Sequence, residues 1–252
     1  MPSLRNIIQG LALSSMMVMA AAAPFPPIVE KVDADDACGN ASVPPTTSKP
    51  EGPNASAVPK IPASGATPDL NVTTLTLAYV TLGHGVQNYS CDAVGATGKA
   101  IGAIAKLYDV TNLAYTDIEM VHKLSAMVVE GQATEEGSEI AIKSAAAKLN
   151  APIIGNHYFD SAGVPVFNLS EKDKIIFAAK TENVKAPATA DKGPLKTGAV
   201  DWLRLVKKEN YAFASKGIQE VYRLETAGGV SSACNATGVI SVPYAAEYWF
   251  YN

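Results

Sequence analysis

The stretch Leu75-Thr76-Leu77-Ala78-Tyr79-Val80-Thr81 alternates large and smaller side chains with the two-residue period of a β-strand. Short apolar segments recur between glycine-rich turns along most of the chain that follows. Gly83-His84-Gly85 is interpreted as a break after this strand. Further strands are expected at 86–91, 100–109, 158–159, 164–169, 174–180, 202–207, 218–226 and 245–251. Such a series predicts a mainly β fold, an antiparallel sandwich or barrel.

One section, about residues 116–149, has a helical period instead. Thr116-Asp117-Ile118-Glu119 matches a capping box and opens an apolar-periodic run to about Glu130. An alanine-rich second helix is expected over 139–149. Asp160-Ser161-Ala162-Gly163 is predicted to be the turn of a hairpin. We therefore expect a short helical insertion within the β-rich domain.

The N-terminal region is typical of an exported protein. Residues 1–22 combine Arg5, an apolar run and small residues, which is the pattern of a cleaved signal peptide. Residues 23–69 are rich in Pro, Ala and Ser and are expected to form a disordered arm. A single domain is expected over 70–252. After signal cleavage we expect a secreted, extracellular protein with no membrane association.

Composition excludes one class of partner. The net charge is -4, whereas a nucleic-acid-binding surface needs an excess of basic side chains. Hydrophobic residues make up 48% of the chain, enough to build a buried core. The oligomeric state is left open. Six N-glycosylation motifs agree with export, at Asn40, Asn54, Asn71, Asn88, Asn168 and Asn235.

Three cysteines, Cys38, Cys91 and Cys234, leave one without a partner if two form a disulfide. The sequence alone allows three pairings. No CxxC or mixed Cys/His spacing indicates a metal site, and none is expected.

Four segments resemble the DUF3455 family, secreted proteins mainly of fungi. They are Gly85–Cys91, Gly155–Phe159, Val221–Gly229 and Val242–Tyr251. The resemblance runs from about residue 70 to the C-terminus, and the family has no established activity. It favours a Cys91–Cys234 disulfide, because both residues lie in or near the family's core segments.

Some fungal members carry the label malate dehydrogenase, which the sequence does not support. Dinucleotide binding requires a glycine-rich turn between a strand and a helix. The nearest candidate, Thr97–Gly102, lacks the third glycine because Ile104 occupies that position. No cofactor is therefore expected.

Two histidines are the main candidates for catalysis. His84 lies between two glycines and His157 precedes the predicted hairpin turn. If they converged with a carboxylate such as Asp160 or Glu225, they could bind a metal or transfer protons. The alternative, which we favour, is that His84 is a turn residue and that His157 holds the hairpin. His122, on the apolar face of the predicted helix, is expected to pack rather than react.

Aromatic residues near carboxylates could bind sugar. Trp202, Tyr222 and Tyr248 are the candidate ligand-binding residues, although all three are also compatible with a core. Arg223 and Glu225 alternate in one predicted strand, so an ion pair on one face is expected.

The sequence therefore favours a non-enzymatic protein over an enzyme. It would act at the cell wall or at a host surface, and polysaccharide is one candidate ligand. The alternative hypothesis is an extracellular hydrolase or metal-dependent enzyme that uses His84 and His157.

Overall fold

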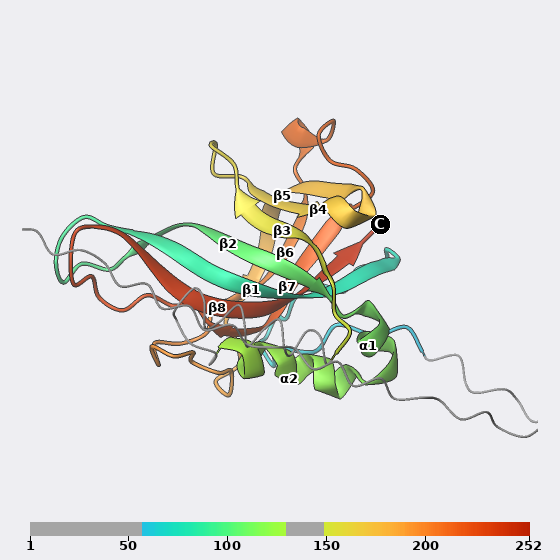
Figure 1. Ribbon diagram of the computed structural model, residues 1–252, viewed down its shortest axis with the longest axis horizontal. Helices are drawn as coiled ribbons and strands as arrows, with labels where there is room; N and C mark the ends of the chain where they lie inside the picture. The colour runs from blue at the N-terminus through green and yellow to red at the C-terminus, as the bar shows by residue number, and fades with distance from the viewer. Residues whose placement is uncertain (1–56, 130–148) are drawn as a thin grey trace, which may run out of the picture. The chain divides into compact units, whose positions relative to one another are not determined.

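The computed structural model describes residues 57–129 and 149–252. Within them, eight antiparallel strands close into a barrel in which each strand pairs with the next and β8 returns to β1 (Figure 1). The strands are β1 Leu77–Cys91, β2 Lys99–Asp109, β3 Ile153–Phe159, β4 Pro165–Leu169, β5 Lys174–Val184, β6 Trp202–Lys207, β7 Glu220–Gly228 and β8 Gly238–Tyr251. The expected mainly β fold is confirmed, and a barrel is the architecture formed.

The predicted break at Gly83-His84-Gly85 is wrong, because β1 runs through it without interruption. A Cβ on Gly83 would lie 2.4 Å from the Tyr248 ring, and one on Gly85 would lie 1.8 Å from the Ile104 carbonyl oxygen. Glycine is needed at these positions for close approach of neighbouring groups. Glycine often signals a turn. In β1 it instead allows neighbouring groups to pack closely against the strand.

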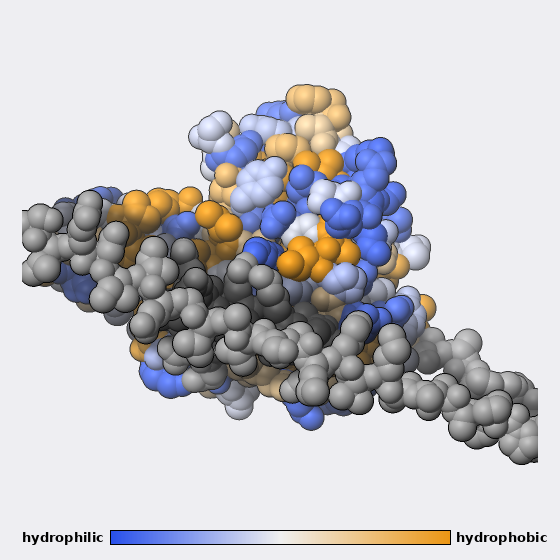
Figure 2. Space-filling model, in the orientation of Figure 1, coloured by the Kyte–Doolittle hydropathy of each residue, from blue (hydrophilic) through white to orange (hydrophobic). Residues whose placement is uncertain are grey.

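Three strands continue past the rest of the barrel. Asn88–Ser90 of β1 pairs with the beginning of β2 on one side and with the beginning of β8 on the other. Cys91 and Cys234 form a disulfide at the tip of this three-stranded extension, in agreement with the pairing that the family resemblance favours. Figure 2 shows apolar surface on the extension, where Ile101, Ile104 and Val239 are exposed.

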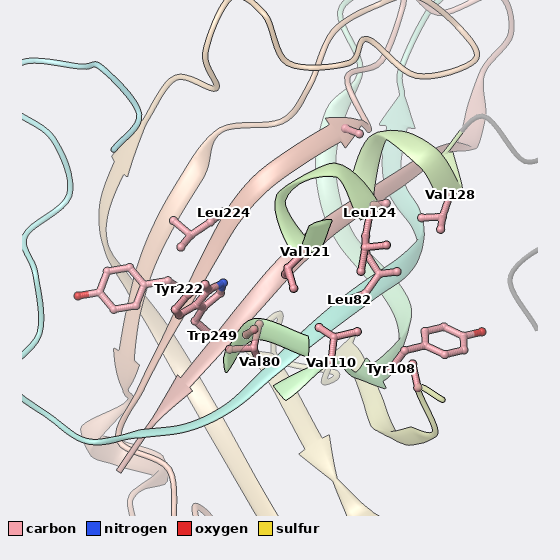
Figure 3. Close-up of a cluster of buried hydrophobic side chains, with 14 of the residues drawn as sticks. Val80, Leu82, Tyr108, Val110, Val121, Leu124, Val128, Tyr222, Leu224 and Trp249 are labelled. Carbon is pink, nitrogen blue, oxygen red and sulfur yellow. The ribbon is translucent and has the colours of Figure 1, made fainter. Parts of the chain in front are cut away.

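The barrel wall separates two hydrophobic cores. The interior core is contributed by most of the strands and includes Phe167, Ile176, Leu205, Val221, Tyr244 and Tyr248. The outer core lies between the wall and two helices, α1 Thr111–Thr116 and α2 Ile118–Val129. Figure 3 shows Val121, Leu124 and Val128 of α2 directed toward Leu82 and Trp249 of the wall. Burying each large apolar side chain stabilises the fold by roughly 1.5–3 kcal/mol.

The helix predicted from about residue 116 is present but begins one residue later than expected. Asp117 caps α2, since its Oδ1 accepts a hydrogen bond from the Met120 amide at 3.0 Å. Thr116 instead ends α1, and its hydroxyl donates back to the Asn112 carbonyl. Helix α1 was not predicted. Nearly all of the second predicted helix, 139–149, lies outside the described residues.

Two short 3₁₀ helices, η1 Ser170–Lys172 and η2 Glu209–Tyr211, complete the elements. The predicted turn at 160–163 joins β3 to β4, where Asp160 Oδ1 accepts from the amides of Ala162 and Val164. In the part of the chain that the structure describes, no helix has the length and apolar character to cross a bilayer.

The end of the expected disordered arm, residues 57–69, is irregular chain that contacts the domain. Ile61 packs against the outer core. The Ser64 hydroxyl donates to Asp69 Oδ1 at 2.7 Å, and Leu70, which follows, is buried. The folded part therefore begins before residue 70, because this segment has a few apolar anchors among its prolines.

Candidate functional site

A cavity of about 620 Å³ extends into the barrel. Its deep part is formed by interior-core side chains such as Phe167 and Tyr248, whereas Gly163 and Lys180 at its edge are exposed. The cavity thus opens to solvent beside the β3–β4 turn. An eight-stranded barrel has an interior just wide enough to be filled or to hold one small ligand. The volume lies within the range of small-molecule sites.

Several aromatic rings line the cavity together with aliphatic side chains. His157 stacks on Phe167 with centroids 4.1 Å apart, and it makes tilted contacts with Phe159 and Tyr248 at 5.5 and 5.6 Å. Tyr211 of η2 adds a further ring to the lining. Aromatic rings of this kind favour a flat, apolar ligand, which can stack on their faces or meet their edges.

His157 is held as a neutral side chain. Its Nδ1 lies 2.9 Å from the Val166 carbonyl, which can only accept, so Nδ1 carries the proton and Nε2 is left as an acceptor. Burial lowers the pKa of His157 to about 4, although the bond to Val166 favours the charged form. The ring therefore adds a polar atom to the cavity without adding charge at neutral pH.

Arg223 supplies a cation to the same cavity. Its Nε and Nη2 donate to the Asp201 carbonyl oxygen at 3.1 and 2.8 Å, which fixes the plane of the guanidinium. Among the described residues, no carboxylate lies within salt-bridge distance of it. The charge of Arg223 is thus held in place by a neutral group.

Gln87 has an unsatisfied atom in the cavity wall. Its Nε2 donates to the Gly102 carbonyl at 2.8 Å, but its Oε1 is buried without a hydrogen-bond partner in the described structure. The side chain is only 7% exposed. A buried acceptor without a partner costs roughly 1–3 kcal/mol, so a ligand donor would be stabilised there once the side chain turns this oxygen toward the cavity.

The two catalytic candidates do not converge. His84 pairs with Ala245, which belongs to the outer core, whereas His157 pairs with Ala105 and Phe167 of the interior core. Paired residues in an antiparallel sheet point to the same face. The two imidazoles therefore lie on opposite sides of the barrel wall. His84 is also not a turn residue, since it lies within β1, and burial lowers its pKa to about 4.

The carboxylates proposed to join the histidines are elsewhere. The Asp160 carboxylate accepts hydrogen bonds from backbone amides of the hairpin turn. Glu225 lies on the outer side of the wall because β7 shifts register between Leu224 and Ala227, and Glu225 adopts a positive φ of 43° there. The same bulge overturns the expected Arg223–Glu225 ion pair, because the two side chains face opposite sides.

The structure instead places a polar cluster under α2 that the sequence did not predict. His122 Nδ1 lies 2.9 Å from Glu247 Oε1, and Trp249 Nε1 donates to Glu247 Oε2 at 2.8 Å. Glu225 is close enough to interact with both His122 and Glu247, and burial, followed by the charge of Glu247, raises its pKa to about 7. The signal available was Glu247 itself, a lone acid in an otherwise apolar strand.

The candidate sugar-binding rings do not form one surface. Trp202 and Tyr222 are almost fully buried in the outer core, and the Tyr222 hydroxyl donates to the Asn71 carbonyl at 2.6 Å. Tyr248 alone lines the cavity. Stacking on a sugar needs an exposed ring face, so these three residues cannot act together.

The glycosylation motifs differ in exposure. Asn71 and Asn235 are exposed, and Asn88 and Asn168 are half-buried within strands. Asn40, Asn54 and Cys38 lie outside the described residues. Within the described ranges, no group of three or more His, Cys, Asp or Glu side chains is arranged to hold a metal ion.

Comparison with known proteins gives one match. A family model described as "Protein of unknown function (DUF3455)" matches residues 72–252. No curated protein and no solved structure matches the chain.

Proposed function

The chain belongs to the DUF3455 family, and we propose that its barrel is the binding site of a small, largely apolar organic molecule. The observation that carries the proposal is the cavity of about 620 Å³, which reaches from solvent to the rings of Phe167 and Tyr248. Most of its wall is apolar, and a few polar groups, chiefly His157, Arg223 and Gln87, converge on it. This combination is the usual composition of a small-molecule site.

The proposal keeps the extracellular, non-enzymatic role expected from the sequence and changes the ligand. Polysaccharide has less support, because Trp202 and Tyr222 are packed inside the outer core. A small-molecule ligand has more support than polysaccharide, because the cavity is concave and partly lined by aromatic rings. We propose that the secreted barrel carries or sequesters such a molecule outside the cell.

An enzymatic role has no matching geometry in the described residues. His84 and His157 are separated by the barrel wall. His157 is neutral and hydrogen-bonded to a backbone carbonyl, which gives it no acidic partner to orient it for proton transfer. Binding is therefore the better supported function.

The direct test is titration of the purified protein with N-phenyl-1-naphthylamine, an uncharged aromatic dye that fluoresces in apolar surroundings. We expect a saturable rise in fluorescence with one dye bound per chain. A signal that grows linearly with dye concentration, without saturation, would contradict the proposal.

A further inference from the structure

The charge of the cavity wall differs from the charge of the chain. The chain carries a net charge of -4, yet the charged side chains in the cavity lining are Lys180, Lys208 and Arg223, with no Asp or Glu among the described lining residues. Lys180 is at the exposed edge, whereas Arg223 is half-buried. A cationic site on an acidic protein attracts anions selectively.

Arg223 is suited to anchor an acid group. Two of its N–H groups hold the Asp201 carbonyl, so the guanidinium is oriented before any ligand arrives. The remaining donors have no described carboxylate to pair with, and the Tyr248 hydroxyl is another group within hydrogen-bonding reach of the guanidinium. A planar guanidinium matches the two oxygens of a carboxylate, and charge-assisted hydrogen bonds are roughly twice as strong as neutral ones.

Gln87 indicates a second, independent property of the ligand, a hydrogen-bond donor. Its Oε1 can only accept and is buried as the side chain lies, so a rotation of the amide would present it to a hydroxyl or amide donor in the cavity. The rings of Phe159, Phe167 and His157 line the same cavity and favour a ligand with a flat apolar body.

Resting on the proposed function, we infer that the ligand is an aromatic carboxylate that also carries a hydroxyl group. The carboxylate pairs with Arg223, the ring packs among the aromatic side chains, and the hydroxyl donates to Gln87 Oε1. Neutral His157 adds a hydrogen-bond acceptor to the site.

The inference is tested with three small probes: 4-hydroxybenzoate, its uncharged methyl ester, and benzoate, which lacks the hydroxyl. Each competes against the neutral naphthylamine dye at pH 7. We expect 4-hydroxybenzoate to bind roughly ten- to a hundredfold more tightly than the ester, the range for one charge-assisted hydrogen-bonded pair. Benzoate is expected to fall between the two.

Two variants assign these preferences to residues. Arg223→Met should bring the acid and the ester to equal affinity, and Arg223→Lys should keep part of the difference. Gln87→Met should bring 4-hydroxybenzoate and benzoate closer together. Lys99→Met removes one positive charge at the exposed tip of the extension and should leave every ratio unchanged, which makes it the matched control.

The possible outcomes distinguish a failure of this inference from a failure of the proposed function. Dye binding retained in Arg223→Met shows that this variant is folded. If the wild-type protein binds the dye but binds acid and ester equally, or if Arg223→Met keeps the preference, the inference is overturned and the proposed function stands. If neither the dye nor any probe binds the wild type, both fail.

Discussion

His122 and Glu247 are 125 residues apart in the chain, yet Nδ1 of one lies 2.9 Å from Oε1 of the other. The contact ties α2 to β8 across the outer core. Glu247 is 0% exposed, and its second oxygen accepts from Trp249, so each oxygen of a buried carboxylate has a donor. Buried charges persist in proteins when they are paired and hydrogen-bonded in this way.

Replacing His122 with Leu should destabilise the fold by about 2 kcal/mol, because one oxygen of the buried Glu247 loses its donor. The cycle of His122→Leu, Glu247→Gln and the double variant should give a coupling of about 1–3 kcal/mol in urea unfolding. His84→Leu is the matched control, since His84 is also half-buried in the outer wall and should cost less than about 1 kcal/mol. Additive single effects would show that the contact stabilises nothing.

Glu225 should make the fold less stable as pH rises. Its pKa is raised to about 7 by burial and by the charge of Glu247, with Glu119 adding to the effect and His122 opposing it. Between the ordinary carboxyl pKa of 4.5 and about 7, the folded state keeps a proton that the unfolded state has lost. Stability is therefore complete below that window and falls through it.

Glu225→Gln should remove this loss. The variant should gain about 1–2 kcal/mol over the wild type between pH 4.5 and pH 8, after allowance for partial solvent screening. The effect must be measured as the difference in stability between variant and wild type, because other groups titrate in or near the same pH range. The raised pKa of His122 acts in the same direction, whereas the lowered values of His84 and His157, about 4, act in the opposite one. A gap between variant and wild type that is the same at both pH values would refute the assignment.

The Cys91–Cys234 disulfide should stabilise the barrel without shaping the cavity. It closes a separation of 143 residues at the tip of the extension. Replacing both cysteines with Ser should cost about 2–4 kcal/mol, measured by thermal or urea unfolding. Dye affinity should be unchanged.

Gly85 should tolerate no side chain. A Cβ there would lie 1.8 Å from a backbone oxygen of β2, so Gly85→Ala should push the strands apart and cost about 3 kcal/mol. Gly95→Ala introduces its Cβ into open space and should cost about 1 kcal/mol, from its positive φ alone. Equal effects in urea unfolding would show that close approach does not explain the glycine.

Local patterns in the sequence predicted most of the elements. Alternation and turn residues located β2, β4, β6 and β7 to within two residues, whereas the expected segments covered only parts of β3, β5 and β8. The apolar period located α2. The error at Gly83–Gly85 arose because glycine signals both turns and close packing, and only the neighbouring Tyr248 and Ile104 decide between them. The bulge at Glu225 had no local signal, since glutamate rarely adopts a positive φ.

The candidate site was less accessible to sequence reasoning. His157 and Tyr248 were both singled out, but which face of the wall each occupies depends on strand register over long separations. The importance of Arg223 follows from the fact that no carboxylate of the described residues lies within salt-bridge distance of it, which no spacing rule can give. His122 and Glu247 meet only because α2 folds back onto β8.

The most direct test of the central claim is dye binding by a pair of Leu→Trp variants. Leu203 lines the cavity and is half-buried, so Leu203→Trp should fill the space and weaken N-phenyl-1-naphthylamine binding at least tenfold. Leu195 is 50% exposed in the loop before β6, so Leu195→Trp should bind the dye as the wild type does. If both variants bind with wild-type affinity, the dye lies elsewhere and the barrel cavity is not the binding site.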